Sequence, residues 1–348
     1  MRHTIVIGAG VSGLACAREI ASSGADVLVL DKARGVGGRC ATRRLAYQGA
    51  TVRFDHGLPF YPVNDARFHA LLQHAGAVVD GWPARNVGAG PVCQPDALLP
   101  VFRRLALADG ASALPKHLSD GLDVRLSTRA TSIHAIPGGV EIRLEDGSAL
   151  TTHRVVVALP VEQARAFAAD IPIAREVLGF FSSRPCLVVM GLWPGSGDLG
   201  WEITRPGGDV AHIADETTKG RPVPPGTRAM VIHASSRFSA EHLADPPETW
   251  LPLLLDACVP HTGEWIRTPL VHETHRWRYA RVDPGTGLAG PLVTRLGDGI
   301  VGWCGEAFDP HGGVAGAWRS GVALAPLLAD AKAAAAPRAG TPAPARSP

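Results

Sequence analysis

The sequence predicts an α/β protein with two lobes, one built around a parallel sheet and the other around an antiparallel sheet. Three observations support this fold class. The chain opens with a strand, a glycine-rich turn and a helix; a second apolar strand follows at once; and residues 179–281 contain closely spaced strand patterns. A chain of 348 residues is long enough for two such lobes, each with its own hydrophobic core.

The first element, residues 4–17, combines a strand, a turn and a helix. Apolar residues 5–7 predict a buried strand, and small and apolar residues recur at helical spacing after the turn. Between them lies Gly8-x-Gly10-x-x-Gly13, whose glycines permit a tight turn, close approach to a pyrophosphate and close helix–strand packing. The helix N-terminus also attracts phosphate groups. This arrangement predicts a Rossmann-like dinucleotide-binding domain.

A second strand and a basic loop extend this site. Residues 26–30 predict a strand that ends at Asp31, roughly 20 residues past the glycines, where a carboxylate can bind a ribose hydroxyl. The next segment, residues 32–44, has three glycines in four positions between Arg34 and Arg39. Because such a loop presents backbone and guanidinium groups to an anion, we interpret it as a second phosphate-facing segment.

The middle of the chain predicts a series of short elements. A strand from residue 52 enters a turn at residues 55–57, and a helix capped by Asn64 follows and stops at Gly76. Another helix is expected over residues 96–108. The remaining expectations are strands over 124–126, 129–136 and 140–144 that form a small meander, a strand over 154–160 and a helix over 161–169.

The second lobe is expected between residues 179 and 281. Its strands are predicted over residues 186–192, 201–204, 210–215, 228–235 and 275–280, with a helix over 248–258. A last strand from residue 300 leads through Gly305 and Glu306 to a helix opened by residues 314–317, a second place where helix N–H groups can meet a cofactor. The Ala/Pro-rich tail after Lys332 is expected to be disordered.

Composition argues against several classes of function. The net charge of +2 favours neither nucleic acid nor an anionic membrane as a partner, and no apolar run approaches the roughly 20 residues of a membrane span. Six scattered cysteines without a Cys-x-x-Cys pair argue against structural zinc and fit a reducing compartment. We expect neither a signal peptide before the first strand nor a metal site. We therefore expect a cytoplasmic protein.

These motifs resemble the FAD-containing amine oxidase superfamily, GR2-type flavoproteins in which a Gly-Gly-Arg segment runs past the pyrophosphate toward the flavin. The resemblance extends from residue 4 to about residue 330. Within it, the Asp-His-Gly turn, residues 231–236 and residues 275–280 are similar to bacterial renalase-like members. The domains implied are a discontinuous FAD-binding domain (1–60, 123–165 and 290–330), a substrate domain (61–122 and 166–289) and a disordered tail (331–348).

The resemblance also implies which residues hold a noncovalent FAD. They are the positions that match the family's nucleotide motifs: Gly8, Gly10, Val11, Ser12, Gly13, Asp31, Lys32, Gly38, Arg39, His56, Gly57, Ala130, Gly305, Glu306, Gly316 and Ala317. Catalytic residues are not identified, because a donor that leaves as a stabilised cation needs no general base. The candidates to line the flavin are His56, His233, His275, Arg276 and Trp277. Cys304 is expected to be a buried thiol rather than a covalent flavin anchor.

Two departures from the family pattern bear on the substrate. The family commonly shows Arg-Val-Glu-Gly-Ala where residues 313–317 of this chain read Gly-Val-Ala-Gly-Ala, after a slightly longer loop. In addition, none of the four lysines (Lys32, Lys116, Lys219 and Lys332) matches the lysine that holds a water at the flavin in amine oxidases.

The renalase-like resemblance implies oxidation of an off-pathway dihydronicotinamide isomer, with hydride transfer to flavin N5 and reoxidation by oxygen or another acceptor. Two alternatives stay open. One is an oxidase of amines or amino compounds, or a desaturase, that acts on a small metabolite; the other is a flavin-binding protein without turnover. The expected partner is a small-molecule substrate such as a nicotinamide dinucleotide, and the residues give no indication of the oligomeric state.

Overall fold

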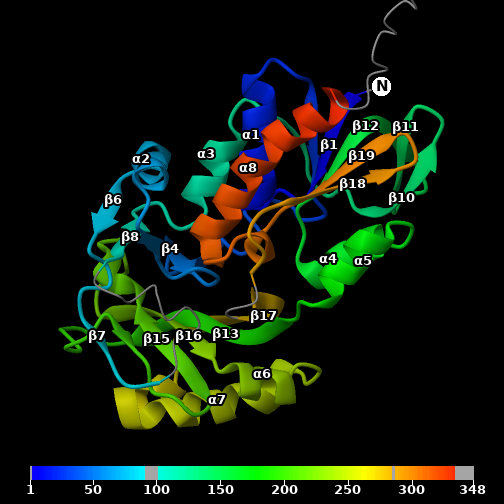
Figure 1. Cartoon of the computed structure of the whole chain (residues 1–348). Coiled ribbons are helices and arrows are strands. Elements are labelled where there is room, and N and C mark those ends of the chain that lie inside the picture. Colours follow the sequence, from blue (N-terminus) through cyan, green and yellow to red (C-terminus); the bar gives the residue numbers. More distant parts are fainter. Residues whose placement is uncertain (1, 91–100, 284–286, 334–348) are drawn as a thin grey trace, which may run out of the picture.

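The computed structural model describes residues 2–90, 101–283 and 287–333. Figure 1 shows two large sheets, one in each of two domains, and a chain that crosses between the domains several times. The fold class predicted from the sequence is therefore confirmed.

The first domain is built on a mixed sheet of eight strands in the order β10–β11–β12–β1–β2–β9, with β19 and β18 attached beside β12. Its parallel strands are β1 (Arg2–Ile7), β2 (Val27–Leu30), β9 (Asp123–Arg125), β12 (Ala149–Val157) and β19 (Gly299–Trp303). The antiparallel additions are β10 (Ala130–Ile136), β11 (Gly139–Leu144) and β18 (Leu292–Leu296). Strands β2 and β19 are buried along their whole length, as expected for parallel strands covered on both faces.

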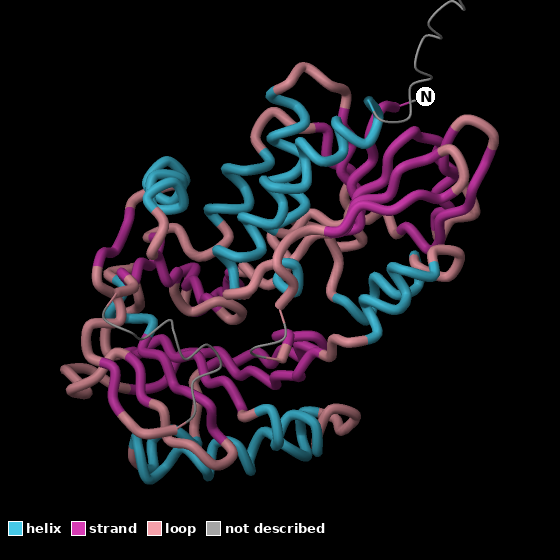
Figure 2. The backbone as a smooth tube through the Cα atoms, in the orientation of Figure 1, coloured by secondary structure: helices cyan, strands magenta, loops and turns pink. Residues whose placement is uncertain are grey.

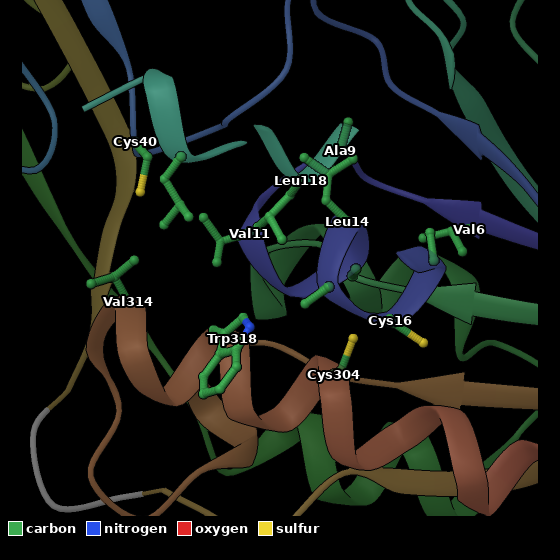
Figure 3. Close-up of a cluster of buried hydrophobic side chains, with 14 of the residues drawn as sticks. Val6, Ala9, Val11, Leu14, Cys16, Cys40, Leu118, Cys304, Val314 and Trp318 are labelled. Atoms are coloured by element: carbon green, nitrogen blue, oxygen red, sulfur yellow. The ribbon is translucent and has the colours of Figure 1, made fainter. Parts of the chain in front are cut away.

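Helices α1 (Val11–Ser22), α3 (Ala113–Ser119) and α8 (Gly313–Ala333) cover one face of this sheet. Their apolar side chains form one buried cluster, in which Leu14 of α1 and Trp318 of α8 take part (Figure 3). A Cβ on Gly321 of α8 would lie 2.1 Å from the Ser12 carbonyl oxygen. The two helices therefore approach more closely than any residue but glycine permits at this point.

The opposite face is covered by α4 (Val161–Ala164), a 3₁₀ turn (Arg165–Phe167) and α5 (Pro172–Gly179). Alternation along β1 divides its side chains between the two cores, because Val6 lies in the first cluster while Ile5 and Ile7 lie in the second. The helix predicted over residues 161–169 is thus present but shorter, and its last part is 3₁₀.

The second domain is a six-stranded sheet in the order β17–β13–β16–β15–β14–β7. Its strands are β17 (Val271–Val282), β13 (Ser183–Pro194), β16 (Thr227–Ala234), β15 (Val210–Asp215), β14 (Ile203–Thr204) and β7 (Asn86–Val87). All neighbours are antiparallel except β14 and β7. Figure 2 shows α6 (Ser236–Glu241) and α7 (Pro247–Thr262) packed beneath this sheet. The predicted antiparallel lobe is confirmed.

The other face of the second sheet packs against a hairpin of the first domain. The hairpin consists of β3 (Thr42–Tyr47) and β4 (Ala50–Asp55), and its buried Leu45, Val52 and Phe54 share one cluster with residues of β13 and β16. The sequence prediction treated residues 42–44 as loop, and they instead open β3. This hairpin connects the two domains and leads directly into the turn after β4.

A small sheet joins β5 (Tyr61–Val63), β8 (Arg103–Leu107) and β6 (Val78–Asp80). The predicted helix over residues 96–108 is wrong where it can be compared, since residues 103–107 are strand β8; residues 91–100 lie outside the described residues. Pairing on both sides of β8 buries Leu105 and Leu107 and outweighs the helical preference of leucine and alanine.

Helix α2 (Ala66–Ala75) follows β5 and ends at Gly76 as predicted, but its cap is Asp65 rather than Asn64. The Asp65 carboxylate accepts from the backbone N–H groups of Arg67 and Phe68 at 2.8 and 3.1 Å, which leaves no capping role for Asn64. Apolar residues of segment 61–122 pack into the same cluster as α1 and α8, although the sequence assigned this segment to the substrate domain.

One predicted meander is also corrected. Strand β9 pairs in parallel with β2 and forms an edge of the first sheet, and only β10, β11 and β12 form a meander. The tail predicted to be disordered begins inside α8, which continues to Ala333, and the rest lies outside the described residues. Among the helices of the described ranges, none is both long and apolar enough to cross a membrane.

Candidate active site

A cavity of about 1240 Å³ extends from the glycine turn after β1 to strand β17 of the second domain. Both domains contribute to its walls. The first supplies the turns after β1, β2 and β4 and the start of α8, and the second supplies parts of β14 to β17. A space of this size and shape suits a bound dinucleotide together with a second small molecule.

The structure explains each of the three glycines of the fingerprint in a different way. Gly8 has φ of +112°, and a Cβ there would lie 2.5 Å from the Ala158 carbonyl oxygen. A Cβ on Gly13 would lie 2.0 Å from the Gly8 carbonyl oxygen, whereas a Cβ on Gly10 would meet no atom within 4 Å. Gly8 and Gly13 are therefore required by packing, and Gly10 faces open space within the cavity. This is the shape that a close-lying pyrophosphate needs.

The Asp31 carboxylate is fixed at the end of β2. Its Oδ2 accepts from the Ala9 N–H at 2.7 Å and its Oδ1 from the Ala33 N–H at 2.8 Å. The Gly-Gly-Arg loop lies against the same turn, because the Gly37 N–H donates to the Ala9 carbonyl at 2.8 Å. The two predicted phosphate-facing segments are thus brought together, and the residues present fit a dinucleotide.

Glu306 is buried between two arginines. Its Oε2 lies 2.6 Å from Arg39 Nη1, and its Oε1 lies 3.3 Å from Arg281 Nη2. Burial raises the pKa of Glu306, but the two guanidinium groups outweigh it and hold the pKa below its usual value. Arg39 also donates to the Ala280 carbonyl at 3.2 Å. The carboxylate therefore joins the Gly-Gly-Arg loop to the end of β17.

An aromatic wall faces the cavity beneath the turn after β4. The rings of His56 and Trp277 stack with centroids 5.3 Å apart at 22°, and His275 lies edge-on to both at 4.9 and 4.2 Å. The Trp277 indole donates to the His56 carbonyl at 3.0 Å. Burial, followed by the neighbouring His275 and Arg43, lowers the pKa of His56 to about 3, and burial with Arg43 lowers the pKa of His275 to about 4. Both imidazoles are neutral at pH 7.

A second histidine pair lies at the substrate-domain end. His212 and His233 are cross-strand partners on β15 and β16, with ring centroids 4.2 Å apart. Burial lowers the pKa of His212 to about 4 and the pKa of His233 well below its ordinary value. Within the described ranges, His56 Nδ1 and His233 Nε2 are buried without a hydrogen-bond partner. Such orphaned groups at a cavity wall indicate that a ligand or water completes them.

Cationic side chains dominate the cavity wall. The described lining residues include nine arginines and two lysines but only two acids, Asp31 and Glu306. Glu306 is already paired with Arg39 and Arg281. Arg43, Arg129 and Arg184 are also paired, with Glu273, Glu145 and Asp283. The remaining cations leave the cavity wall with a net positive charge, which favours anions. The cations are Lys32, Arg39, Arg43, Arg44, Lys116, Arg129, Arg184, Arg205, Arg276, Arg278 and Arg281.

The structure brings most of the predicted site residues together. All of the candidates His56, His233, His275, Arg276 and Trp277 line the cavity, as do the predicted cofactor residues except Gly13 and Gly316. Gly13 packs against the Gly8 turn, and a Cβ on Gly316 would lie 2.7 Å from Asp309 Oδ1, so both glycines serve packing. The predicted contacts to FAD remain predictions, since the arrangement alone does not test them.

Several lining residues were missed by the sequence reasoning. Arg43 and Arg44 lie on β3, at the end of the segment 32–44 that was predicted to face phosphate, but they were not named as site residues; Arg278 lies on β17 and His212 on β15. The local signal for Arg43 and Arg44 was their place in that basic segment, and for His212 it was the pairing with His233 once the register of two predicted strands is known.

The lysines divide between the cavity and the interior. Lys32 and Lys116 line the cavity, whereas Lys219 is buried outside it and bound to Asp55. Cys304 is fully buried, and burial raises its pKa to about 12. It is not among the described residues that line the cavity.

Comparison with known protein families matches residues 6–75 to the NAD(P)-binding Rossmann-like domain and residues 84–328 to the flavin containing amine oxidoreductases. The chain belongs to the flavin containing amine oxidoreductase family. As a member of this family it is a flavin-dependent oxidoreductase, and FAD is the cofactor that its nucleotide motifs fit.

Solved structures of family enzymes share this fold across both domains. Wild-type putrescine oxidase bound to putrescine is similar with a TM-score of 0.68 at 14% identity, over 95% of this chain and 99% of its own. Cyclohexylamine oxidase from Brevibacterium oxydans IH-35A is similar with a TM-score of 0.68 at 14% identity, over 95% of this chain and 99% of its own. At such identities the likeness concerns the fold alone.

Curated relatives match over a short segment. The zeta-carotene-forming phytoene desaturase of Myxococcus xanthus is 50% identical over 50 residues, which are 14% of this chain and 9% of the desaturase. Phytoene desaturase of Neurospora crassa is 45% identical over 56 residues, again 9% of its length. The chain spans less than a tenth of the length of these relatives, so the likeness carries no statement about substrate.

Proposed function

We propose that this family member oxidises a dihydronicotinamide isomer of NAD(P), in the manner of the renalase-like proteins, and uses oxygen or another acceptor to complete the cycle. The observation that supports the proposal is the cationic cavity wall. A protonated amine would enter a positive potential, whereas the pyrophosphate of a dinucleotide donor would be attracted by it.

The chain's own residues suit a flat donor with one anionic end. The stacked rings of His56 and Trp277 offer a planar wall for a nicotinamide ring. Neutral imidazoles at His56, His233 and His275 can donate to or accept from a carboxamide without adding charge beside the ring. Arg44 and Arg278, which are exposed on strands that line the cavity, are placed to bind the phosphates. FAD, when bound, supplies the hydride-accepting group.

We further propose that FAD is held without a covalent bond and that the reaction takes place in the cytoplasm with a small-molecule substrate alone. The buried Cys304 lies off the cavity wall, and burial raises the pKa of the lining Cys40 to about 12, which keeps that thiol protonated and unreactive. The free thiols of the five described cysteines suit a reducing compartment.

Anaerobic stopped-flow absorbance of the FAD-loaded protein tests the proposal. We expect rapid loss of the oxidised-flavin band on mixing with 2- or 6-dihydro-NAD(P) and none with amines or amino acids. Arg278→Ala should raise the donor Kd about tenfold, because a hydrogen bond to a charged group is lost. Arg237→Ala, which removes an exposed arginine of α6 outside the cavity wall, is the matched control and should behave as the wild type.

An oxidase of amines or amino compounds, or a desaturase, is the second candidate. The Gly-Val-Ala-Gly-Ala turn at the start of α8 favours it, because Gly313 lines the cavity at a position where the family pattern has arginine, which leaves room for a different substrate. Flavin reduction by an amine alone would establish this candidate and reject the first. Reduction by no donor in either panel would favour a flavin-binding protein without turnover.

A further inference from the structure

Four charged side chains form a buried cluster behind the cavity wall. Asp55 ends β4, Glu216 and Lys219 lie on the 3₁₀ turn after β15 (Glu216–Lys219), and Arg221 follows it. Their side chains are at most 3% exposed. None of the four lies among the described residues that line the cavity, so neither the proposed cofactor nor the donor accounts for the cluster.

Lys219 bonds to both ends of one short turn. Its Nζ donates to Asp55 Oδ2 at 2.9 Å and to the Pro59 carbonyl at 2.8 Å, and it forms an ion pair with Glu216 Oε1 at 2.6 Å. The ammonium group also lies 4.2 Å from the centre of the Trp82 ring. Because Asp55 and Pro59 enclose residues 56–58, a single buried ammonium holds both ends of the turn that carries His56.

That turn has little freedom on its cavity side. A Cβ on Gly57 would lie 2.0 Å from the Arg39 carbonyl oxygen and 3.2 Å from the Trp277 ring. The His56 carbonyl accepts from the Trp277 indole at 3.0 Å, and the His56 ring stacks on Trp277. A displacement of the turn would therefore move His56 relative to both the Gly-Gly-Arg loop and the aromatic wall.

Arg221 connects the cluster to a different segment of the chain. It donates to Asp55 Oδ2 at 2.5 Å and Glu216 Oε2 at 2.8 Å, and to the carbonyls of Leu107 and Ala108 at 2.7 and 3.1 Å. These bonds attach the cluster to the end of β8, and none of them reaches residues 56–59. Two carboxylates and two cations balance in charge, which is the condition for burying such a group. Lys219 alone joins it to Pro59.

We propose that Lys219 is a positioning residue for the cavity: it holds the 56–58 turn, and through that turn it sets the place of the His56 ring beside Trp277. The inference rests on the assignment of the cavity to FAD but not on the identity of the donor. Lys219 was unassignable from the sequence because its partner Asp55 lies 164 positions away in the chain.

The test compares Lys219→Met with Arg228→Met. Methionine keeps the length of the side chain but removes the ammonium group. Arg228 forms a buried ion pair with Asp215 in the same domain and donates to the Gly197 carbonyl, without contact to the 56–58 turn. Both variants break a buried ion pair, so they are matched for general loss of stability.

Two readouts are taken on the FAD-loaded proteins: the His56 imidazole NMR signal with its pH titration, and flavin reduction by 6-dihydro-NAD. In Lys219→Met we expect a displaced His56 signal that titrates nearer to the ordinary histidine range. The limiting reduction rate should fall at least tenfold while the donor Kd changes less than threefold. Arg228→Met should leave the signal in place and the rate within twofold.

The proposal is overturned if Lys219→Met leaves the His56 signal and the rate unchanged, or if the two variants are altered alike. If Lys219→Met does not fold, Lys219→Arg replaces it, since the charge is kept while a planar guanidinium cannot reproduce the three ammonium contacts. A folded Lys219→Arg protein with a wild-type His56 signal would equally reject the positioning role. If 6-dihydro-NAD fails to reduce even the wild type, the proposed function fails, and the NMR comparison still decides on Lys219.

Discussion

Replacing Gly10 by alanine separates cofactor binding from folding. Gly10 precedes α1 with φ of −77° and ψ of 175°, which alanine adopts without strain, and the new Cβ would meet no atom within 4 Å. Alanine is a poorer cap residue than glycine, which lowers the stability, but it also restricts the unfolded chain, which raises it. Because these effects offset one another, the free energy of unfolding of the apoprotein should change by less than about 1 kcal/mol.

Cofactor affinity should respond much more strongly. The added methyl group enters the cavity beside the α1 N-terminus, where the pyrophosphate must approach. Each hydrogen bond to a charged group is worth about 1.5–3 kcal/mol, so the loss of one raises the Kd for FAD at least about tenfold. Gly13→Ala is the counterpart: its Cβ would lie 2.0 Å from the Gly8 carbonyl oxygen, and overpacking should cost about 2–3 kcal/mol.

The assay has two parts, urea unfolding of the apoproteins followed by circular dichroism, and titration with FAD followed by flavin fluorescence. We expect Gly10→Ala to fold as the wild type and bind FAD weakly, and Gly13→Ala to lose stability as well. Wild-type FAD affinity in Gly10→Ala would refute the placement of the cofactor at this turn. Wild-type stability in Gly13→Ala would refute the packing argument.

Three further predictions concern buried polar groups. The folded-state pKa of His56 lies at about 3, below the ordinary value of 6.5, so its neutral form stabilises the protein above pH 6.5 and this contribution is lost as the pH falls. At pH 5 the loss is about 2 kcal/mol, and His56→Gln should flatten the unfolding profile between pH 7 and 5 by that amount. Tyr61→Phe removes the hydroxyl that donates to the Ala111 carbonyl at 2.5 Å, and it should cost about 1–2 kcal/mol in urea unfolding without changing the rate of flavin reduction. Glu306→Gln removes the charge between Arg39 and Arg281, and it should lower the free energy of unfolding by about 2 kcal/mol, less than a fully buried pair because both arginines are partly exposed. Thermal unfolding at pH 7 checks this last value, and a melting temperature equal to the wild type would contradict it.

The nucleotide-binding elements of the first domain could be predicted from local sequence patterns. The glycine turn, strand β2 and its terminal Asp31 lie within 31 consecutive residues, and their spacing alone places them together. Strand β15 was predicted with its observed bounds because turn signals enclose an apolar run on both sides. These features depend on neighbours in the chain, which is why they could be predicted.

Features that depend on contacts between distant segments could not be predicted from local patterns. Strand β8 looks helical by composition and becomes a strand only because β5 and β6 pair with it. Arg43 and Arg278 come to one cavity wall through the placement of two sheets, and no sequence spacing links them. The Lys219–Asp55 contact joins segments of different domains in the same manner.

The strand order of the first sheet determines when its strands can pair during translation. Ile5, Val155 and Val301 stand side by side on β1, β12 and β19, so β1 can pair with β2 early but gains its neighbour on the other side, β12, only after more than 100 further residues have been translated. The cavity wall is complete only after Val314 and Ala317 of α8 have emerged from the ribosome. The predicted FAD site is therefore assembled from both ends of the chain. A chain cut before β19 would keep the glycine turn and Asp31 but lack the part of the cavity wall that Gly305, Glu306 and α8 supply.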